Sequence, residues 1–434
     1  MNIFALTSFF EIFKQKLGSQ IQVMSERPYD IAVYGASGYT GKYVAAEVVR
    51  TCQGKKIAIA GRSKAKLEKV FDVIEKECGW NTRGEVGIII ADSSNEESIR
   101  EMCRQSCIVI NCVGPFRWYG EQVVKACVDM ATNYVDISGE PEYLQMLQLK
   151  YHKQAEEKGI HIVGACGFDS VPADVGLELL REKFNGELTA AESYIHLYGP
   201  QKGNYGTYLT IIHSVQGRKN LKIQQKAIFK ERLRFTGPKL LMRYPGFSKS
   251  ENRWFIPFLG ADPSVVRRTQ LYESMNHNQT PIQYGAYFTA PSFLVAFFMI
   301  LFGLLVWIFT KFSFGIKLLE KYPKIFSFGT FSFEGPSRED LARGGFKMVF
   351  HGKGYSEKPT SSAAAGKPDK GLSMQIIGPE IGYIFTSICV VACAKTILDD
   401  NLRNRGGVLT AGSAFKGTGL IDRLINRGVK FEIL

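Results

Sequence analysis

Short apolar runs, separated by amphipathic stretches, fill the first part of the chain. Helical patterns such as Gly120–Met130 and Glu142–Lys158 alternate with runs that suit buried strands. Parallel sheets are covered on both faces, so their strands form continuous apolar runs with helices between them. The region therefore predicts a doubly wound parallel sheet of the α/β class, with strands at Tyr29–Tyr34, Lys56–Ala60, Val86–Ala91, Cys107–Val113, Tyr134–Ile137 and Ile160–Val163.

The pattern changes from about Ala190. Ser193–Tyr198 and Tyr205–Ser214 are aromatic, β-branched and partly alternating, which predicts antiparallel strands with one exposed face. Arg218–Phe235 is a basic helical stretch, and Gly352–Gly371 has the composition of a mobile loop. One strand and two helices are predicted to follow, at Leu372–Ile377, Gly378–Asp399 and Leu420–Gly428.

Composition and charge narrow the class of partner. With 434 residues, of which 45% are hydrophobic and 22% charged, the chain suits two globular domains. The formal net charge of +13 predicts attraction to nucleotide phosphates or anionic lipid. No zinc-knuckle, RNP-like or basic-zipper pattern accompanies the charge, so nucleic acid is not an expected partner.

The nine cysteines lie mostly in apolar runs, which indicates buried free thiols in a reducing compartment. None has the spacing of a zinc site, so no metal is expected. Residues 1–27 precede the first strand, and their lysines follow the apolar stretch, which is the reverse of a secretory signal. A short helix on a membrane surface and a disordered extension are both open for this segment.

A glycine-rich turn follows the first predicted strand and begins a helix. Glycine allows the tight turn, the approach of the backbone to a pyrophosphate, and the packing of the helix on the strand. The helix N-terminus then offers unpaired N–H groups to the phosphates. This order of elements predicts a dinucleotide site. Its loop is Gly35, Ala36, Ser37, Gly38, Tyr39, Thr40 and Gly41.

Two further turns bear on the cofactor. An NAD enzyme usually has an acidic residue after the second strand, where this chain has Arg62, Ser63 and Lys64. A guanidinium, a hydroxyl and an ammonium suit a 2′-phosphate, so NADP(H) is predicted in preference to NAD(H). Gly114 and Pro115 follow the fourth strand, and we expect this turn to contact the ribose or the nicotinamide.

These segments together resemble the saccharopine dehydrogenase-like oxidoreductases. The resemblance rests on GASGYTG, AGRS, NCVGPF, YVDISGE, GACGFDSVPADVG and, near the C-terminus, GGVLTAGSAF followed by IDRL. It implies a Rossmann domain at residues 28–189 and an inserted mixed α/β substrate domain at 190–378. The C-terminal helices, at 379–434, would then complete the Rossmann domain. Animal members of the family are associated with lipid droplets and membranes, and related bacterial members act as trans enoyl reductases in glycolipid synthesis.

The resemblance supplies no catalytic residue. Hydride transfer needs a group that gives or takes a proton. The candidates at predicted strand ends are Tyr119, Asp136, Glu140, Asp169 and Ser170. Each of them also suits a turn or a helix cap, Asp169 and Ser170 before Pro172 in particular.

A second chemistry is open for the same loop. Acyl-phosphate reductases, such as semialdehyde dehydrogenases, use a cysteine thiolate and a histidine. Cys166 lies just before a predicted helix N-terminus, which would lower the pKa of its thiol, and His196 or His213 would be its partner. The alternative role of Cys166 is that of a buried inert thiol.

Phe293–Phe309 is an apolar segment of 17 residues without a charge or a polar stripe. As a helix it spans about 26 Å, at the short edge of what crosses a bilayer. A buried core helix would usually show a polar stripe, so we favour contact with lipid. A single crossing would separate the two parts of the Rossmann domain, so the attachment we favour is monotopic, to a membrane or a lipid droplet. Lys311, Lys317, Lys321 and Lys324 follow at the expected level of lipid head groups.

Two hypotheses of different class follow. The first is an NADP(H)-dependent oxidoreductase, attached to a lipid droplet or to the cytosolic face of a membrane, that reduces a lipid or other apolar substrate. The second is a nucleotide-binding scaffold of the droplet surface with little or no catalysis, since no acid–base pair is recognisable. Mitochondrial association and a homo-oligomer are both compatible with the sequence.

Overall fold

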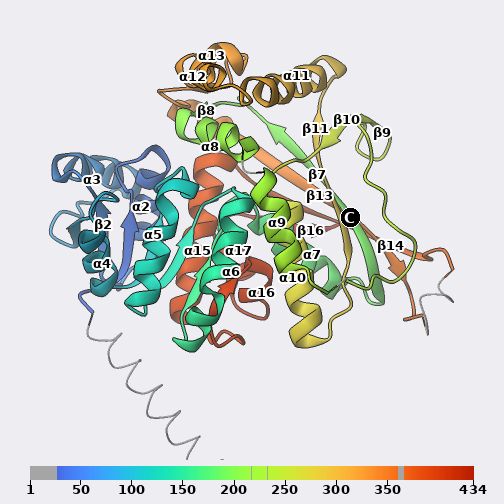
Figure 1. Ribbon diagram of the computed structural model, residues 1–434, viewed down its shortest axis with the longest axis horizontal. Coiled ribbons are helices and arrows are strands. Elements are labelled where there is room, and N and C mark those ends of the chain that lie inside the picture. Colours follow the sequence, from blue (N-terminus) through green and yellow to red (C-terminus); the bar gives the residue numbers. More distant parts are fainter. Residues whose placement is uncertain (1–26, 217, 232, 360–365) are drawn as a thin grey trace, which may run out of the picture.

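Two sheets lie side by side in the computed structural model, with helices around the first and a helical layer above both (Figure 1). The structure describes residues 27–216, 218–231, 233–359 and 366–434. The expectations for residues 1–26, and for the middle of the loop between 352 and 371, therefore fall outside the described residues. Arg27 is buried, and its guanidinium donates hydrogen bonds to the Ser106 carbonyl at 2.5 Å and to the Thr132 hydroxyl at 2.7 Å.

The first sheet is parallel throughout and has the strand order β3-β2-β1-β4-β5-β6-β15. Its first six strands follow the Rossmann order, in which the chain reverses direction across the sheet between β1 and β4. This confirms the α/β, doubly wound prediction. The strands are β1 (Tyr29–Tyr34), β2 (Ile57–Gly61), β3 (Val86–Ile90), β4 (Ser106–Asn111), β5 (Asn133–Asp136), β6 (His161–Val163) and β15 (Gly407–Leu409).

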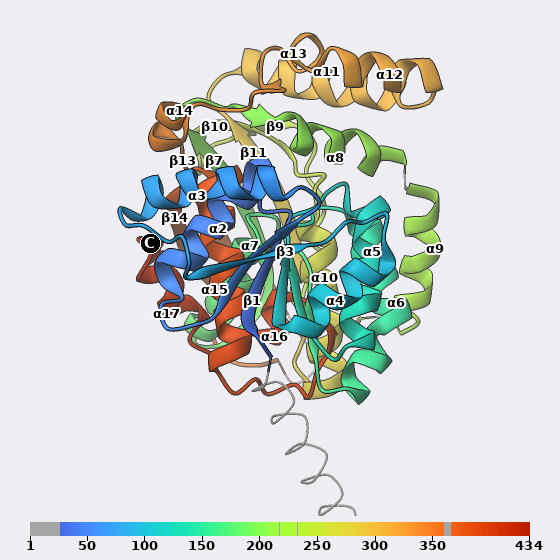
Figure 2. The same cartoon turned by 90° about the vertical axis from the view of Figure 1, so that its left-hand side faces the viewer.

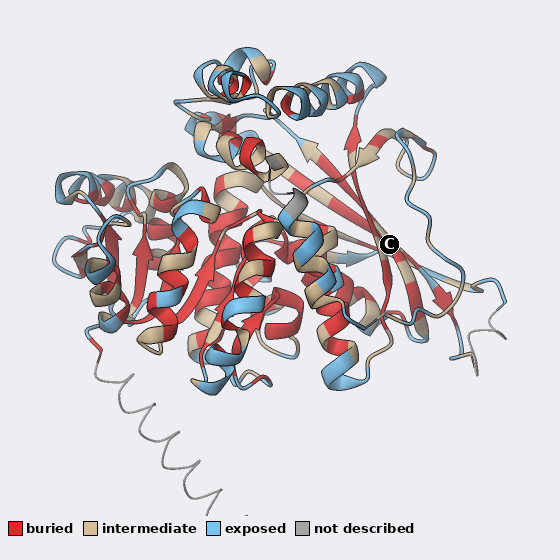
Figure 3. Cartoon of the chain, in the orientation of Figure 1, coloured by how far each residue is buried: buried red, intermediate tan, exposed pale blue. Residues whose placement is uncertain are grey.

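Helices cover both faces of this sheet. One face packs on α2 (Tyr39–Thr51), α3 (Lys64–Cys78) and α15 (Thr386–Asp399). The other packs on α4 (Glu96–Gln105), α5 (Phe116–Asp129) and α6 (Pro141–Glu157). Burial is concentrated in the strands and on the inner faces of these helices (Figure 3).

The second sheet is mixed, with the order β16-β14-β13-β7-β11-β10-β9. Only β7 and β11 run parallel, and every other neighbouring pair is antiparallel. α7 (Val171–Lys183) and α10 (Asp262–His277) pack between the two sheets. The strands are β7 (Glu187–Tyr198), β9 (Gly246–Ser248), β10 (Arg253–Pro257), β11 (Gln283–Ala290), β13 (Gly345–Tyr355), β14 (Lys370–Pro379) and β16 (Lys430–Ile433).

One strand predicted for this region is a helix. Tyr205–Ser214 lies within α8 (Tyr205–Gln216), because its aromatic residues repeat at helical spacing. Tyr208 and Ile212, four residues apart, are buried against the helical layer above, and partly buried Tyr205 packs with them. α9 (Arg218–Ile228) follows α8, and β8 (Gly203–Asn204), directly before α8, forms a short parallel pair with β12 (Phe331–Ser332).

The helical layer consists of α11 (Phe293–Phe309), α12 (Ser313–Lys321) and α13 (Pro323–Phe326), with α14 (Arg338–Arg343) below it. Figure 2 shows α11, α12 and α13 together along one side of the molecule. The first-sheet strands run toward that side, so their carboxyl ends face the layer. The predicted helix Phe293–Phe309 is therefore present, and it is not a core helix.

The C-terminal segment contributes to both sheets. β15 pairs with β6 in the first sheet, whereas β16 pairs with β14 in the second. Its helices are a π-helical turn η1 (Ile381–Phe385), α15, α16 (Ala411–Ala414) and α17 (Leu420–Ile425). Ile381–Asp399 has the length and composition of a membrane span, but it is largely buried against α2, β4 and β5 and serves as a core helix.

Candidate functional site

The glycine loop joins β1 to α2 at the carboxyl edge of the first sheet. Gly35 has a φ of +82°, in the region that favours glycine. A Cβ on Gly41 would lie 2.1 Å from the Gly35 carbonyl oxygen, and one on Gly38 would lie 3.1 Å from the same atom. The turn therefore exists only with small residues at these positions. Such a cradle fits the approach of a pyrophosphate to the backbone.

The start of α2 is open to an anion. Its N-cap is Gly38, which provides no side-chain hydrogen bond, and the first turn has no acidic residue. Backbone N–H groups at a helix start carry partial positive charge and bind phosphate when no side chain satisfies them. The residues of the loop therefore fit the pyrophosphate of a dinucleotide in both shape and charge.

Tyr39 faces the inserted part of the chain. Its hydroxyl donates a hydrogen bond to the Pro336 carbonyl, and its ring lies edge-on to that of Tyr383 at 4.6 Å between centroids. The Lys42 ammonium lies 4.2 Å from the centre of the Tyr39 ring. Tyr39 thus fastens the loop to the segment before α14. Ala36 is buried in the core, Ser37 is exposed and Thr40 is half-buried.

The turn after β2 holds the predicted 2′-phosphate residues. Arg62 and Lys64 are exposed, and no hydrogen bond or ion pair holds either side chain among the described residues. Ser63 is the N-cap of α3, yet its hydroxyl makes no capping bond. The guanidinium, hydroxyl and ammonium are thus available to a ligand. The site fits NADP(H) better than NAD(H), because no carboxylate stands at the end of β2 to receive ribose hydroxyls.

The turn after β4 packs directly on the glycine loop. A Cβ on Gly35 would lie 2.6 Å from Cγ2 of Val113, so the two turns meet where the strand order reverses. The Asn111 side chain fixes this turn: its oxygen accepts the Val113 N–H at 2.9 Å, and its amide donates to the Tyr134 hydroxyl at 3.0 Å. Gly114 and Pro115 follow, and α5 begins at Phe116.

Two of the acidic candidates, Glu140 and Asp136, fix the turns at the carboxyl edge of the first sheet. The buried Glu140 carboxylate accepts the N–H groups of Phe116 and Arg117 at 2.8 and 3.1 Å, and so caps α5. Asp136 accepts hydrogen bonds from the Ser138 hydroxyl at 2.7 Å and the Ala165 N–H at 2.9 Å. Burial raises the pKa of both carboxyls. Their contacts are those of groups that position turns.

The remaining candidates lie at different depths. Tyr119, on α5, is 39% exposed and lies beside exposed Trp118. Asp169 is half-buried at the turn after β6, and burial raises its pKa to about 6. Ser170 is fully buried at the start of α7. The structure also brings Asp262 beside Asp169, which the sequence could not reveal, because Asp-Pro at a helix start is an ordinary beginning for α10.

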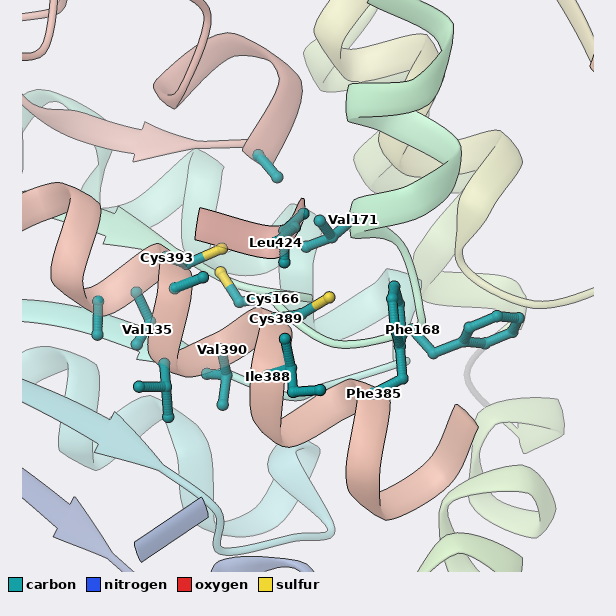
Figure 4. Close-up of a cluster of buried hydrophobic side chains, with 14 of the residues drawn as sticks. Val135, Cys166, Phe168, Val171, Phe385, Ile388, Cys389, Val390, Cys393 and Leu424 are labelled. Carbon is teal, nitrogen blue, oxygen red and sulfur yellow. The ribbon is translucent and has the colours of Figure 1, made fainter. Parts of the chain in front are cut away.

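Of the two roles open for Cys166, the structure favours that of a buried inert thiol. Its side chain is fully buried among Val135, Phe168, Cys389 and Cys393 (Figure 4), and its thiol donates to the Val163 carbonyl. Burial raises the pKa of this thiol well above its usual value, whereas a nucleophile needs a lowered one. Both proposed partners bond carboxylates instead, His196 with Glu251 at 2.7 Å and His213 with Glu320 at 3.1 Å.

The helical layer presents an apolar surface. Only Ala296 and Val306 of α11 are buried, and Val306 packs on α8 and α12. We call the exposed apolar side chains of α11 to α13 and the turns beside them the apolar platform: Phe293, Leu294, Val295, Phe297, Phe298, Ile300, Leu304, Trp307, Ile308, Phe312, Phe314, Ile325 and Phe328. Lys311, Lys317, Lys321 and Lys324 are exposed around it, and the Lys311 ammonium lies 3.4 Å from the centre of the Trp307 ring.

One chain of contacts joins the platform to the crevice. Glu320 of α12 bonds His213 of α8, and the His213 ring lies 4.4 Å from that of Trp118 at the start of α5. Arg117 donates to the His213 carbonyl and bonds Glu142 of α6 at 2.7 Å. Among the described residues, no group of three or more histidine, cysteine or carboxylate side chains is arranged to hold a metal ion.

Comparisons with known proteins agree with this geometry. The family model of the saccharopine dehydrogenase NADP binding domain matches residues 31–163. The saccharopine dehydrogenase-like oxidoreductase of Rattus norvegicus is 41% identical over 94% of this chain and 98% of its own length. The lipid droplet localized protein of Caenorhabditis elegans is 38% identical over 93% and 98%. A probable mitochondrial saccharopine dehydrogenase-like oxidoreductase of Arabidopsis thaliana is 35% identical over 94% and 97%.

Proposed function

This chain belongs to the saccharopine dehydrogenase-like oxidoreductase family, which confirms the resemblance, and from that premise we propose that it reduces an apolar substrate at a lipid surface. The family and its NADP binding domain make the chain an NAD(P)-dependent oxidoreductase and bear out the preference for NADP(H). The substrate class, the residues that bind it and the surface at which it works are what we propose.

We assign the cofactor to the carboxyl edge of the first sheet. Residues 35–41 would hold the pyrophosphate, Arg62, Ser63 and Lys64 the 2′-phosphate, and Gly114 and Pro115 the nicotinamide half. The steric limits on Gly35, Gly38 and Gly41 support this, as do the unengaged side chains of Arg62 and Lys64. Bound NADPH supplies a hydride. The protein must orient the acceptor, exclude water and deliver a proton.

The apolar platform is the observation that carries the proposal. Soluble monomers rarely expose a contiguous apolar patch of more than a few hundred Å². The platform instead exposes 13 large apolar side chains, with lysines at its margin and an aromatic ring under one of them. Apolar helices flanked by lysine and tryptophan are typical of interfacial helices that lie in the plane of a lipid surface.

A lipid surface fits this platform better than a second protein. The inner face of α11 is already occupied by α8, α12, β10 and β11, so only its outer face is free to contact a partner. The exposed lysines complement anionic head groups, each contributing about 1 kcal/mol near such lipid. The worm relative, named a lipid droplet localized protein, agrees with this choice. The platform lies on the side toward which the first-sheet strands run (Figure 2), so a docked molecule would draw its substrate from the lipid.

The proposal is tested with purified full-length protein, NADPH and carbonyl or enoyl acceptors of two lengths. Long-chain enals, enones and ketones are carried in vesicles of neutral and anionic phospholipid, and short-chain homologues are dissolved in buffer. We expect NADPH oxidation with at least one vesicle-borne acceptor, at a kcat/KM above that of its short homologue. Equal or faster turnover of the short homologues would contradict the proposal of an apolar substrate. Failure of the protein to float with the vesicles would contradict the proposal that it docks on a lipid surface.

A further inference from the structure

The turn after β6 brings one carboxyl group to the edge of the crevice. Asp169 follows Gly164–Phe168 and is half-buried, and the described residues provide no hydrogen-bond donor to its side chain. A Cβ on Gly139 would lie 2.8 Å from its Oδ2 atom, so the turns after β5 and β6 meet at this carboxyl. In a Rossmann sheet these strands stand on the nicotinamide side of the point where the strand order reverses.

A second carboxyl lies behind it, on the inserted part of the chain. Asp262 is fully buried at the start of α10, and neither of its oxygens has a hydrogen-bond partner among the described residues. The Ser170 hydroxyl faces it without meeting the geometry of a hydrogen bond. Burial first, and then the charge of Asp169, raise the pKa of Asp262 well above its usual value. A buried carboxyl without a donor keeps its proton, because desolvation disfavours the charged form.

The groups around this pair do not neutralise it. Asp174 of α7 is buried, and burial raises its pKa to about 7 although it accepts the Gly412 N–H at 2.7 Å. Tyr284 of β11 is bonded to Ser193 at 2.6 Å, and burial raises the pKa of its phenol. The Arg268 guanidinium donates to Gln148, and its charge acts on Asp174. Burial and the mutual repulsion of the two carboxyls therefore favour a state in which the pair retains a proton.

We propose that Asp169 is the proton donor of the reduction, at the nicotinamide end of the crevice, and that Asp262 is a positioning residue for its proton. This rests on the proposed function. The hydride comes from NADPH, and the acceptor gains a negative charge on the oxygen or carbon left behind. The Asp169 O–H bond breaks, its proton bonds that atom, and the carboxylate takes a new proton from water in the crevice. The balance is one hydride and one proton per acceptor.

The location of Asp169 is tested by binding, without any substrate. The nicotinamide ring is positively charged in NADP⁺ and neutral in NADPH. The two nucleotides carry the same phosphates, so the titration of the phosphates cancels in the ratio of the two dissociation constants. A carboxylate beside the ring favours NADP⁺ once it ionises. Calorimetry between pH 5 and pH 8 should show this ratio changing about tenfold in favour of NADP⁺, which corresponds to a shift of about one pKa unit.

Four variants separate the roles. Asp169→Asn should make the ratio independent of pH, whereas Asp174→Asn, which removes another buried carboxyl, should leave its pH dependence as in the wild type. Asp262→Leu should move the midpoint of that dependence upward, because the proton that our proposal places on Asp262, beside the Asp169 carboxylate, is lost. Asp262→Asn should restore the midpoint, because its amide N–H replaces that proton. Where Asp262→Leu does not fold, Asp169→Asn decides the result.

The outcomes separate the inference from the function on which it rests. If the wild type binds neither nucleotide, the cofactor site of the proposed function is wrong. If it binds both with a ratio that does not change with pH, or if Asp169→Asn keeps the change, only the role of Asp169 is overturned. If Asp262→Leu leaves the midpoint unmoved, Asp262 has no part in positioning the proton.

Discussion

The cofactor crevice and the apolar platform lie on the same side of the molecule and are built in opposite ways. In the crevice, a run of seven residues fixes the backbone so closely that one added methyl group would meet a carbonyl oxygen at 2.1 Å. On the platform, large side chains of α11 are exposed, and only two of its residues are buried. One region depends on exact backbone shape, the other on exposed apolar area.

The difference follows from the two ligands. A pyrophosphate is bound by backbone N–H groups at fixed distances, so its site tolerates little change in shape. A lipid surface is fluid and binds through the sum of the apolar area that it covers. Changes in the platform should therefore add up by area, whereas single atoms should decide the crevice.

The largest effect is expected on the platform. Replacing Phe297, Ile300, Leu304 and Ile308 together with serine removes four exposed apolar side chains. At about 1.5 kcal/mol or more for each buried side chain, binding to vesicles should weaken by at least about a thousandfold. Flotation with vesicles of neutral and anionic lipid measures the loss, and titration with NADPH should give an unchanged dissociation constant. Undiminished flotation would refute the docking surface, and loss of NADPH binding would show that the two regions are not independent.

The second effect is expected in the crevice. Gly41→Ala places a Cβ 2.1 Å from the Gly35 carbonyl oxygen, and the backbone on both sides leaves it no room. Overpacking of this kind costs about 1 to 3 kcal/mol, and the shifted turn should lose most of its affinity for NADPH. Urea unfolding and nucleotide titration measure the two losses. Gly303→Ala on α11 is the matched control, because its Cβ would meet nothing within 4 Å and both measurements should stay at wild-type values.

The crevice was also the region that could be predicted from the sequence. Its glycine loop, the strand before it and the helix after it are adjacent in the chain, so local pattern sufficed for the first sheet. The helix Phe293–Phe309 could also be predicted from the sequence, since no polar residue interrupts this apolar segment. The helical spacing of Tyr208 and Ile212 was missed, because partial alternation in Tyr205–Ser214 also fits a strand.

What the sequence could not reveal depends on contacts between distant segments. Asp262 lies far along the chain from Asp169, and only the packing of α10 against the turn after β6 brings them together. The position of Cys166 before a helix suggested a lowered pKa, but the thiol lies in a core to which α15 contributes Cys389 and Cys393. Burial then outweighs the field of the helix start.

A smaller effect is expected at the rim of the crevice. Arg62 is exposed directly after β2, where a 2′-phosphate would lie, and among the described residues its side chain makes no hydrogen bond or ion pair. Arg62→Ala removes a charge-assisted contact, which contributes about 1.5 to 3 kcal/mol when it is buried. Because Arg62 is exposed, we expect a smaller loss, about tenfold in the affinity for NADPH. Thermal shift and titration should show weaker NADPH binding with NADH binding unchanged. Equal loss of affinity for both nucleotides would mean that Arg62 does not contact the 2′-phosphate. Lys66→Ala, which removes another exposed cation of α3, serves as the control.

The smallest effect concerns the stability of the crevice itself. Burial raises the pKa of Asp169 to about 6, above its value in an unfolded chain, so the protonated carboxyl is favoured by folding. This contribution is fully present below about pH 4 and is lost as the pH rises through about 6. Asp169→Asn should therefore match the wild type near pH 4. At pH 8 it should be more stable by about 1 kcal/mol, less than the about 3 kcal/mol of the full shift because the carboxyl is only half-buried, as measured by urea unfolding at both pH values. A variant that is less stable at pH 8 would mean that folding favours the ionised carboxylate, and the pKa of Asp169 would then not be raised. The same measurement on the four-residue platform variant should show the wild-type pH dependence, because the platform contributes no titrating group to this pair.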